Sequence, residues 1–338
     1  MPFFSRIVVI GVGLIGGSIG LAVKKRQLSE NVIGIDHDEK SLQTALRLGA
    51  LDRGTTDFHE GINTETGIAA SENAQPDAGA YTPSSLPGAE LIIAATPVSL
   101  VFDHVLQAAS AVQTGGINYR NVLITDVGST KETICSRFEQ ITLPNGCRFI
   151  GSHPIAGKEK SGVEHADADL FENRLAVITP TTSARDRDIG LLIRFWRSLG
   201  SLTASMSPVE HDRTLARTSH LPHILSALLA DRLQLQDTKY TGPGYHSTTR
   251  LASGVPDLWR DIISNNTEAI LEAIRDYEGA LRDLREKIER SDWEAVAQFL
   301  EHAKSNRDML NIDDAPDLER KAVISARELS NVRRIPDG

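Results

Sequence analysis

Glycines at a fixed spacing near the N-terminus are the first residues whose types could do chemistry. The run GVGLIG contains Gly11, Gly13 and Gly16, follows a short apolar segment and opens a stretch of helix-forming residues. The first glycine suits a tight turn, the second lets backbone approach a pyrophosphate, and the third lets a helix pack closely on a strand. The N–H groups of the first helical turn, at Leu14 and Ile15, would hold the phosphates. The spacing predicts a dinucleotide-binding turn.

An acidic side chain closes the second apolar run and indicates which dinucleotide is bound. Asp36 follows Val32–Ile35 directly. It stands about 20 residues after Gly16, the position from which a carboxylate accepts hydrogen bonds from ribose hydroxyls. A carboxylate also repels a 2′-phosphate, and Arg47 and Arg53 are too distant in sequence to clamp one. We therefore expect NAD, not NADP.

Polar segments follow three more apolar runs and carry further candidate groups. They are Thr96-Pro97-Val98, the segment Asp126–Ser129, and Gly151–Pro154. In an open parallel sheet the carboxyl ends of the strands share one edge, where ligands bind. His153 would then lie beside the nicotinamide and take a proton as hydride leaves. A strand-end histidine satisfied by backbone groups is the alternative. Thr96, Pro97, Val98 and Asp126 are expected to contact the cofactor.

The elements that must position these groups predict an α/β fold with a doubly wound, Rossmann-type parallel sheet. Strands are expected at Arg6–Ile10, Val32–Ile35, Leu91–Ala95, Val122–Thr125, Phe149–Ile150 and Ala176–Ile178, with helices between them and a closing helix at Ile189–Leu199. The stretch Asp57–Pro87 is rich in Gly, Ala, Ser, Thr and Pro and has no sustained period. We expect it to be a mobile surface insertion.

After Pro208 the sequence becomes helical in character. Leucines and isoleucines between Leu215 and Leu229 predict one apolar helix. Apolar residues then recur every three or four positions from Leu258 to Ile288, which predicts a single helix of about 30 residues and about 45 Å. Such a helix is too long for one small domain to cover, so we expect it to pack against a second copy in a homodimer. The expected limits are 1–205 for an NAD-binding domain, 206–312 for an all-helical substrate and dimerisation domain, and 313–338 for a tail.

Composition restricts the partners and the compartment. Of the 338 residues, 40% are hydrophobic and 24% charged, as in ordinary globular proteins, and the net charge of −9 argues against a nucleic-acid partner. No apolar run approaches the roughly 20 residues of a membrane helix. Cys135 and Cys147 fit no metal motif and are expected to be reduced thiols. The expectation is a cytoplasmic protein with a small-molecule substrate, no membrane partner and no metal.

Several segments together resemble the prephenate/arogenate dehydrogenase family. The resemblance runs from about Arg6 to Arg307 and rests on Gly11–Ser18 (GVGLIGGS), Ala95–Val98 (ATPV), Asp126–Lys131 (DVGSTK), Gly151–Gly162 (GSHPIAGKEKSG), Ser219–His223 (SHLPH) and Thr248–Trp259 (TTRLASGVPDLW). The first two segments occur in many dehydrogenases. The runs SHPIAG, SHLPH and TTRLAS, in this order and spacing, are much more specific.

The resemblance implies roles for individual side chains. His153 matches the catalytic histidine that hydrogen-bonds the 4-hydroxyl of the substrate ring and accepts its proton. Ser129 matches a serine that orients that hydroxyl and the nicotinamide. Arg250 matches the arginine that pairs with the substrate carboxylate, a task that suits a guanidinium. His223 matches a histidine near the side-chain end of the substrate, and His220 is expected in the same wall; capping or core histidines are the alternative.

Other matches are less specific. Glu159 and Lys158 match a loop at the mouth of the pocket, and Trp259 is expected to line the pocket, although core packing explains it equally well. In one respect the chain departs from the family pattern. Where members often carry an acidic residue shortly before the arginine, this chain has His246 and Ser247, which puts the hydrogen bonds of that loop in doubt.

The resemblance implies the NAD-dependent oxidative decarboxylation of prephenate to 4-hydroxyphenylpyruvate in tyrosine biosynthesis. Arogenate, which carries an amino group in place of the keto group, is the alternative substrate and would give tyrosine directly. A β-hydroxyacid dehydrogenase shares the fold but would need a lysine and a different glycine pattern in the helical domain. A regulatory, NAD-sensing dimer without activity is a further alternative, disfavoured because His153, Ser129 and Arg250 are all present.

Overall fold

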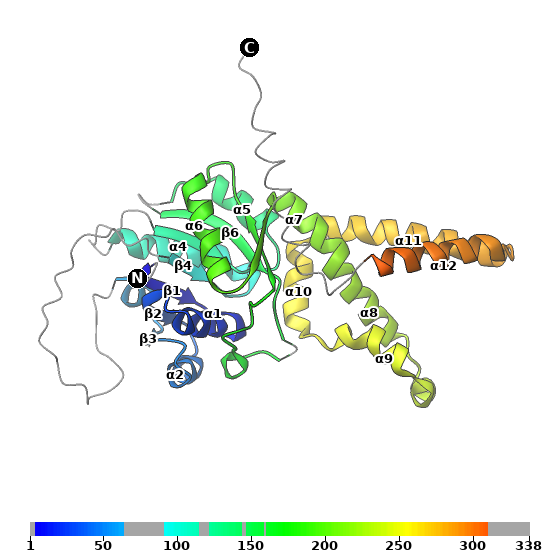
Figure 1. Ribbon diagram of the computed structural model, residues 1–338, viewed down its shortest axis with the longest axis horizontal. Helices are drawn as coiled ribbons and strands as arrows, with labels where there is room; N and C mark the ends of the chain where they lie inside the picture. The colour runs from blue at the N-terminus through cyan, green and yellow to red at the C-terminus, as the bar shows by residue number, and fades with distance from the viewer. Residues whose placement is uncertain (1–3, 64–90, 115–121, 144–146, 159, 310–338) are drawn as a thin grey trace, which may run out of the picture. The chain divides into compact units, whose positions relative to one another are not determined.

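The fold consists of two compact units, Met1–His211 and Asp212–Gly338. The computed structural model describes the chain except residues 1–3, 64–90, 115–121, 144–146, 159 and 310–338. The first unit is a sheet with helices on it, and the second is built from helices (Figure 1). The predicted fold class is confirmed. The predicted limits of the functional domains, 1–205 and 206–312, stay predictions, and the predicted tail, 313–338, lies outside the described residues.

An eight-stranded sheet forms the centre of the first unit, in the order β3-β2-β1-β4-β5-β6-β7-β8. Its strands are β1 (Phe4–Ile10), β2 (Ser29–Ile35), β3 (Arg53–Thr55), β4 (Leu91–Ala94), β5 (Val122–Asp126), β6 (Cys147–Pro154), β7 (Leu175–Thr179) and β8 (Leu202–Ser205). Neighbouring strands are parallel except for β6 and β7. The central strands are nearly continuous apolar runs because both faces of a parallel sheet are covered.

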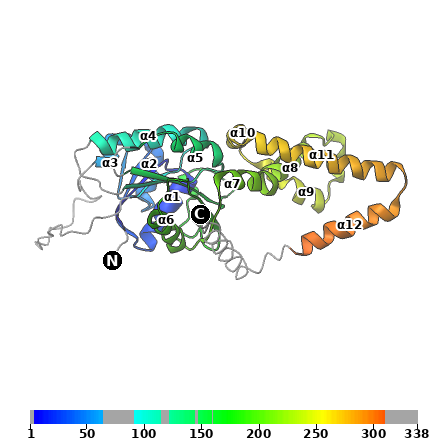
Figure 2. The same ribbon diagram turned by 90° about the horizontal axis from the view of Figure 1, so that it is seen from above.

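Helices cover both faces of this sheet. One face carries α1 (Leu14–Lys25), α2 (Glu39–Arg47) and α6 (Asp186–Ser198), and the other carries α3 (Phe58–Asn63), α4 (Val98–Thr114) and α5 (Glu132–Glu139). Successive side chains of a strand point to opposite faces, so Ile7 and Val9 enter the first core and Val8 and Ile10 the second. Figure 2 shows α4 and α5 on one side of the strands and α1 and α6 on the other.

Strand β6 is longer than predicted and changes partner along its length. Its first half pairs with β5 in parallel, and Gly151–Pro154 pairs with β7 in antiparallel register, with His153 opposite Val177. The predicted parallel sheet therefore contains one antiparallel pair, β6–β7, which needs no crossover helix. His153 was expected to follow the strand, and instead it lies within it.

Among the strands of the sheet and the helices that cover it, strands β3 and β8 and helix α3 were not predicted. Strands β3 and β8 have three and four residues, RGT and LTAS, and lack an apolar run that would indicate a strand. Helix α3 occupies the beginning of the stretch Asp57–Pro87, and its Ile62 is buried in the core. The prediction of a mobile insertion is therefore wrong for Phe58–Asn63. The insertion from residue 64 onward lies outside the described residues.

The second unit is helical. Helix α7 (Pro208–Leu215) leads into it, followed by a π-helical stretch, η2 (Ala216–His220), α8 (Leu221–Asp231), η3 (Leu235–Tyr240), α9 (Pro243–Thr249), η4 (Arg250–Ser253), α10 (Pro256–Asn265), α11 (Thr267–Glu289) and α12 (Trp293–Asp308). Among its described residues, one small buried cluster consists of Ala216, Ala269, Ile270 and Ala273. Within the described part of the chain, every helix is too short or too polar to cross a membrane.

The long helix predicted over Leu258–Ile288 is wrong, because the chain forms two helices. Helices α10 and α11 are separated at Asn266, whose backbone (φ −135°, ψ 36°) is not helical. The two helices run in different directions in Figure 1. The apolar helix predicted between Leu215 and Leu229 is continuous, but it contains the π-helical stretch Ala216–His220 before α8. Apolar periodicity continues across the break at Asn266 and across this stretch, so it could not reveal either of them.

Candidate active site

The ends of four parallel strands bring the predicted polar segments to one edge of the sheet. Ile10 of β1 lies in register with Ile35 of β2 and Ala94 of β4. Ala94 in turn lies in register with Asp126 of β5. The loops that follow these strands therefore start side by side, as ligand-binding loops do in doubly wound sheets. This edge is the candidate active site of the first unit.

The glycine-rich turn between β1 and α1 has the geometry that its sequence predicts. Gly11 has a φ of +90°, and a Cβ there would lie 2.7 Å from the Ala95 carbonyl oxygen. A Cβ on Gly16 would collide with the carbonyl oxygen of Gly11. No atom lies within 4 Å of a Cβ placed on Gly13, which leaves open space above the turn. The turn thus fits a bound pyrophosphate.

Asp36 ties the end of β2 to that turn. Its Oδ2 accepts a 2.6 Å hydrogen bond from the Val12 backbone N–H, and its Oδ1 accepts one of 2.9 Å from Asp38 N. Oδ1 also lies 3.0 Å from Nδ1 of His37, whereas Oδ2 has a second lone pair that can accept from a ribose hydroxyl. Helix α1, which begins with Leu14 and Ile15, has no acidic residue in its first turn that would repel phosphate.

Helix α4 carries a histidine that the sequence reasoning missed and that contacts the loop before the helix. His104 Nδ1 lies 3.1 Å from Oγ1 of Thr96. Burial lowers the pKa of His104, so the ring is uncharged at neutral pH. Thr96 is half-buried and Pro97 is exposed, whereas the Val98 side chain is part of the core. Val98 could therefore meet a cofactor only through its backbone.

Asp126 belongs to a buried ion pair. Its Oδ2 accepts hydrogen bonds from the Lys131 ammonium and, at 2.8 Å, from Gly128 N, while Oδ1 lies 3.3 Å from Ser152 N. The side chains of Asp126 and Lys131 are both 0% exposed. The carboxylate that was predicted to bind the cofactor is therefore fully enclosed by protein. It fixes the loop that carries half-buried Ser129 against strand β6.

His153 pairs with a second histidine that no motif indicated. Its Nδ1 lies 2.9 Å from Nε2 of His211, and the two ring centroids are 5.1 Å apart at 64°. His153 is 8% exposed, and His211 is 0% exposed. A hydrogen bond between the rings orients both imidazoles and couples their tautomers, because one of the two nitrogens must donate and the other must accept. His153 thus has a structural partner that suits a proton acceptor.

In the second unit, His223 and Trp259 form a stacked pair. Their ring centroids are 3.4 Å apart and the planes differ by 15°. Gly254 lies against both rings, since a Cβ there would be 2.6 Å from Trp259 Nε1 and 2.7 Å from His223 Cε1. Burial lowers the pKa of His223, which keeps the stacked ring uncharged at neutral pH. The structure thus brings two predicted substrate residues into contact.

His220 lies beside this pair. Its ring meets Trp259 edge to face, with centroids 6.2 Å apart. Its Nδ1 is 3.1 Å from Nδ2 of Asn266, the residue that separates α10 from α11. His220, His223 and Trp259 therefore form one aromatic cluster, which we call the ring cluster. Asn266 was not among the sequence candidates.

The remaining predicted substrate residues are less constrained by the structure. Arg250 is the first residue of η4 and is exposed. His153 belongs to the first unit and Arg250 to the second, so their predicted meeting at one substrate stays a prediction. His246 Nε2 lies 3.4 Å from Thr241 Oγ1. Glu159 lies outside the described residues.

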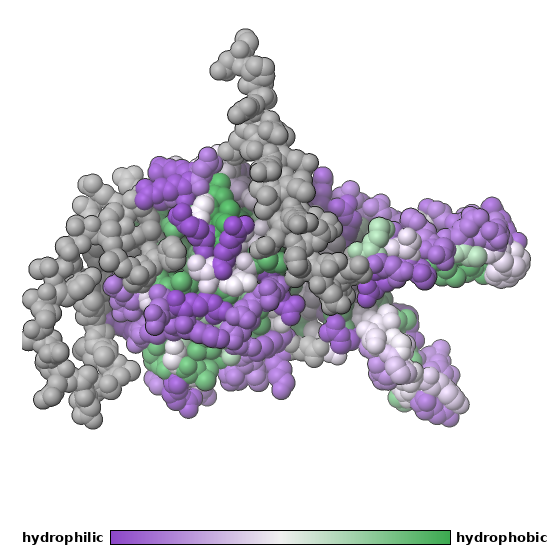
Figure 3. Space-filling view, in the orientation of Figure 1, coloured by the Kyte–Doolittle hydropathy of each residue, from purple (hydrophilic) through white to green (hydrophobic). Residues whose placement is uncertain are grey.

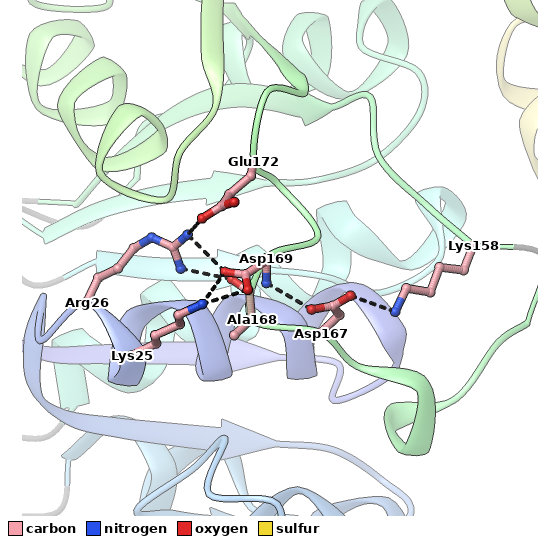
Figure 4. A network of polar contacts seen from close by, with 7 residues as sticks. All are labelled: Lys25, Arg26, Lys158, Asp167, Ala168, Asp169 and Glu172. Atoms are coloured by element: carbon pink, nitrogen blue, oxygen red, sulfur yellow. Dashed lines mark hydrogen bonds and ion pairs between the residues drawn. The ribbon is translucent and has the colours of Figure 1, made fainter.

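One ion pair closes the loop after β6 on itself, and another fastens it to α1. Lys158 Nζ lies 2.9 Å from Asp167 Oδ2, and Lys25 Nζ lies 2.6 Å from Asp169 Oδ2 (Figure 4). Backbone of Asp169 and the Lys158 ammonium hold the pKa of the Asp167 carboxyl below its usual value. A Cβ on Gly17 of α1 would lie 2.7 Å from Val163 Cγ2, so the loop also packs tightly on the helix. Lys158, predicted at the pocket mouth, closes this loop.

A glycine-rich turn, an acidic residue after β2 and a buried histidine pair at the same sheet edge define a nucleotide-dependent oxidoreductase. Two family models match the chain: "Prephenate dehydrogenase, nucleotide-binding domain" over residues 62–204 and "Prephenate dehydrogenase, dimerization domain" over 207–304. A prephenate dehydrogenase of Bacillus subtilis is 32% identical over 90% of this chain and 76% of its own length. One from Lactococcus lactis is 30% identical over 91% of this chain and 78% of its own.

A solved structure agrees with these matches. Prephenate dehydrogenase from Aquifex aeolicus, in complex with hydroxyphenyl propionate and NAD+, has a TM-score of 0.75 and 28% identity, and the alignment covers 91% of this chain and 98% of that one. The chain belongs to the prephenate dehydrogenase family.

Proposed function

We propose that this chain oxidises prephenate with NAD and releases carbon dioxide, giving 4-hydroxyphenylpyruvate and NADH for tyrosine biosynthesis. The observation that carries the proposal is the His153–His211 pair, which lies in the same unit as the dinucleotide turn. The relatives that are at least 30% identical are prephenate dehydrogenases, which supports this substrate. They do not favour arogenate.

Bound NAD would supply the acceptor for the hydride that leaves the substrate ring. The chain's part is to hold the dinucleotide, and the open space at Gly13 and the N–H groups at Leu14 and Ile15 suit the pyrophosphate. Asp36 suits the ribose hydroxyls and disfavours a 2′-phosphate. Thr96 and Pro97 follow β4 at the same edge.

His153 serves as the base for the ring 4-hydroxyl in this proposal. For Nε2 to accept that proton, Nδ1 must carry the hydrogen and donate it to His211 Nε2. His211 then acts as a positioning residue, since its acceptor nitrogen holds the reactive tautomer and stabilises the imidazolium that forms. Ser129 helps to orient the hydroxyl. As hydride and proton leave, the carboxylate at C1 departs as carbon dioxide and its electrons complete the aromatic ring.

The other end of the substrate is assigned to the second unit. Arg250 pairs with a carboxylate, for which its planar guanidinium is suited. His223, His220 and Trp259 form the wall beside the side chain of prephenate, and their mutual ring contacts support one shared surface. Glu159 is assigned to the pocket mouth on the resemblance alone.

We further propose that the enzyme is a cytoplasmic homodimer formed through the helical unit. The family description "dimerization domain" for residues 207–304 supports the dimer. Exposed apolar residues on α11 and α12, among them Leu281, Trp293 and Leu300, also support it. Figure 3 shows apolar patches interrupting the polar surface of these helices. Cys135 and Cys147 are both buried free thiols, which suits a reducing compartment.

The direct test is an assay of the purified full chain with NAD or NADP and with prephenate or arogenate. We expect NADH and 4-hydroxyphenylpyruvate to form in equal amounts with prephenate and NAD. Product identity is read by chromatography and NADH by absorbance. NADH formation with arogenate but not with prephenate would contradict the proposed substrate.

A further inference from the structure

Asn266 separates α10 from α11, and its side chain bonds to another helix instead of capping α11. It stands at the N-cap of α11, where an asparagine side chain ordinarily accepts a hydrogen bond from the N–H groups of the first turn. Here the side chain makes no such bond. Asn266 is also only 5% exposed. Its side-chain amide therefore points away from the first turn of α11 and bonds to other groups.

The side chain of Asn266 contacts two groups of the helix that begins the second unit. Its Nδ2 donates a 2.9 Å hydrogen bond to the Asp212 carbonyl oxygen and lies 3.1 Å from His220 Nδ1. The orientation of the amide follows from the first contact, because a carbonyl oxygen can only accept. The opposite orientation would place two oxygen atoms at that distance. The NH2 group then has one hydrogen for each partner.

This geometry fixes the hydrogen on the imidazole of His220. An NH2 group that donates to Nδ1 requires a bare nitrogen there, so the hydrogen of the neutral ring is on Nε2. We propose that Asn266 is a positioning residue that locks His220 as the Nε2–H tautomer. The locked ring belongs to the ring cluster with Trp259 and His223.

The consequence for the substrate site rests on the proposed function. His220 is only 1% exposed, so its ring acts through its neighbours and not by direct contact with prephenate. The fixed ring meets Trp259 edge to face, and Trp259 stacks on His223. Asn266 thus holds the geometry of the wall assigned to the prephenate side chain without touching the substrate itself.

The test inverts the hydrogen bond while keeping the shape of residue 266. In Asn266→Asp a carboxylate faces His220 and can only accept, so Nδ1 of the ring should become protonated. Thr267→Asp is the matched control, because it adds the same charge one residue later at an exposed position of the first turn of α11. The measurement is long-range proton–nitrogen NMR of histidine-labelled full-length protein, with His220 assigned by its loss in His220→Gln.

We expect an unprotonated Nδ1 in the wild type and in Thr267→Asp, and a protonated Nδ1 in Asn266→Asp. A protonated Nδ1 in the wild type, or no change in Asn266→Asp, would overturn the lock. If Asn266→Asp does not fold, the wild-type spectrum alone decides. A residue that only breaks the helix would leave the tautomer unconstrained, and the wild type would then show both forms.

Steady-state kinetics tests the effect on substrate binding separately from the tautomer of His220. With prephenate, Asn266→Asp should raise KM about threefold to tenfold, as expected when loss of one hydrogen bond shifts the ring cluster, while KM for NAD stays within twofold. An unchanged prephenate KM despite a flipped tautomer would refute the role of Asn266 in holding the substrate wall. A wild-type enzyme that shows the lock but does not oxidise prephenate would instead refute the proposed function.

Discussion

The two units position their candidate groups in different ways. In the first, backbone register brings four strand ends to one edge, and a buried ion pair between Asp126 and Lys131 fixes the loop beside His153. In the second, the ring cluster is held by ring contacts and by the amide of Asn266, and the buried cluster in the described part of this unit consists of three alanines and Ile270. The sheet therefore fixes the positions of the candidate groups in the first unit, and a few side-chain contacts fix them in the second.

The second unit also exposes apolar surface that the first keeps inside. Tyr277, Leu281 and Ile288 of α11 are 43%, 56% and 48% exposed and recur at helical spacing. A small core and an exposed apolar stripe are what a unit has when part of its apolar surface is covered by a second copy. We therefore expect the stability of the first unit to depend on its buried ion pair, and that of the second unit to depend on association with a second copy of the chain.

The largest effect is expected at the buried ion pair. Lys131→Met leaves the Asp126 carboxylate buried without its cation, which should lower the free energy of unfolding by about 3–5 kcal/mol. Lys158→Met makes the same change in a surface pair, with side chains 40% and 43% exposed, and should cost at most about 1 kcal/mol. Urea unfolding followed by circular dichroism measures both. Equal losses in the two variants would show that burial of the pair does not matter.

An intermediate effect is expected on association. If the stripe on α11 is buried in a homodimer, Leu281→Ser should weaken dimerisation by about 1.5–3 kcal/mol, or roughly ten- to a hundredfold in Kd. Asp283→Ser, two residues away and also exposed, is the control that removes no apolar surface. Sedimentation velocity at several protein concentrations distinguishes monomer from dimer. A dimer of unchanged affinity in Leu281→Ser would exclude this stripe from the interface.

A smaller effect is expected on the choice of cofactor. Asp36→Asn removes the charge that opposes a 2′-phosphate but keeps an oxygen that can accept from Val12 N. The ratio of kcat/KM with NADP to that with NAD should rise about tenfold, or about 1.4 kcal/mol. Asp38→Asn removes a charge of equal size at the N-cap of α2 and should leave the ratio unchanged. A rise of the same size in both variants would point to net charge alone.

The smallest effect is expected for the loop after β6 in acid. Asp167 has its pKa below the usual 3.8, so its pairing stabilises the fold above that pH, and the contribution is lost as pH falls through the lowered value. The difference in unfolding free energy between the wild type and Lys158→Met should therefore be present at pH 7 and shrink below pH 3.8. A difference that grows on acidification would contradict this sign.

The sequence predicted those parts that depend on local patterns. Strands such as β1 and β4 are continuous apolar runs, and the glycine-rich turn needs residues without a Cβ, so both can be recognised from residue types. The break at Asn266 was missed because apolar periodicity continues from Ile262 to Ile270 across it. A buried asparagine whose side chain bonds to a neighbouring helix leaves no recognisable pattern in the sequence around it.

For the same reason, some residues of the candidate site could be predicted from the sequence and others could not. Motif residues such as His153 could be named from the chain, but the partners that orient them could not. His211 and Lys131 become functional candidates only when the fold places them 2.9 Å from His153 and against Asp126, respectively. Asp126 was assigned to the cofactor because it follows a strand, and the structure encloses its carboxylate instead.

The most direct test of the central claim compares His153→Asn with the wild type in two measurements on the same preparations. Asparagine keeps a polar side chain of similar reach but cannot accept the hydroxyl proton as a base. Turnover of prephenate should fall by about 10²–10⁴-fold, as for loss of a general base, while the affinity for NAD, measured by calorimetric titration, should stay within about twofold. Turnover close to that of the wild type, with NAD still bound, would contradict His153 as the base.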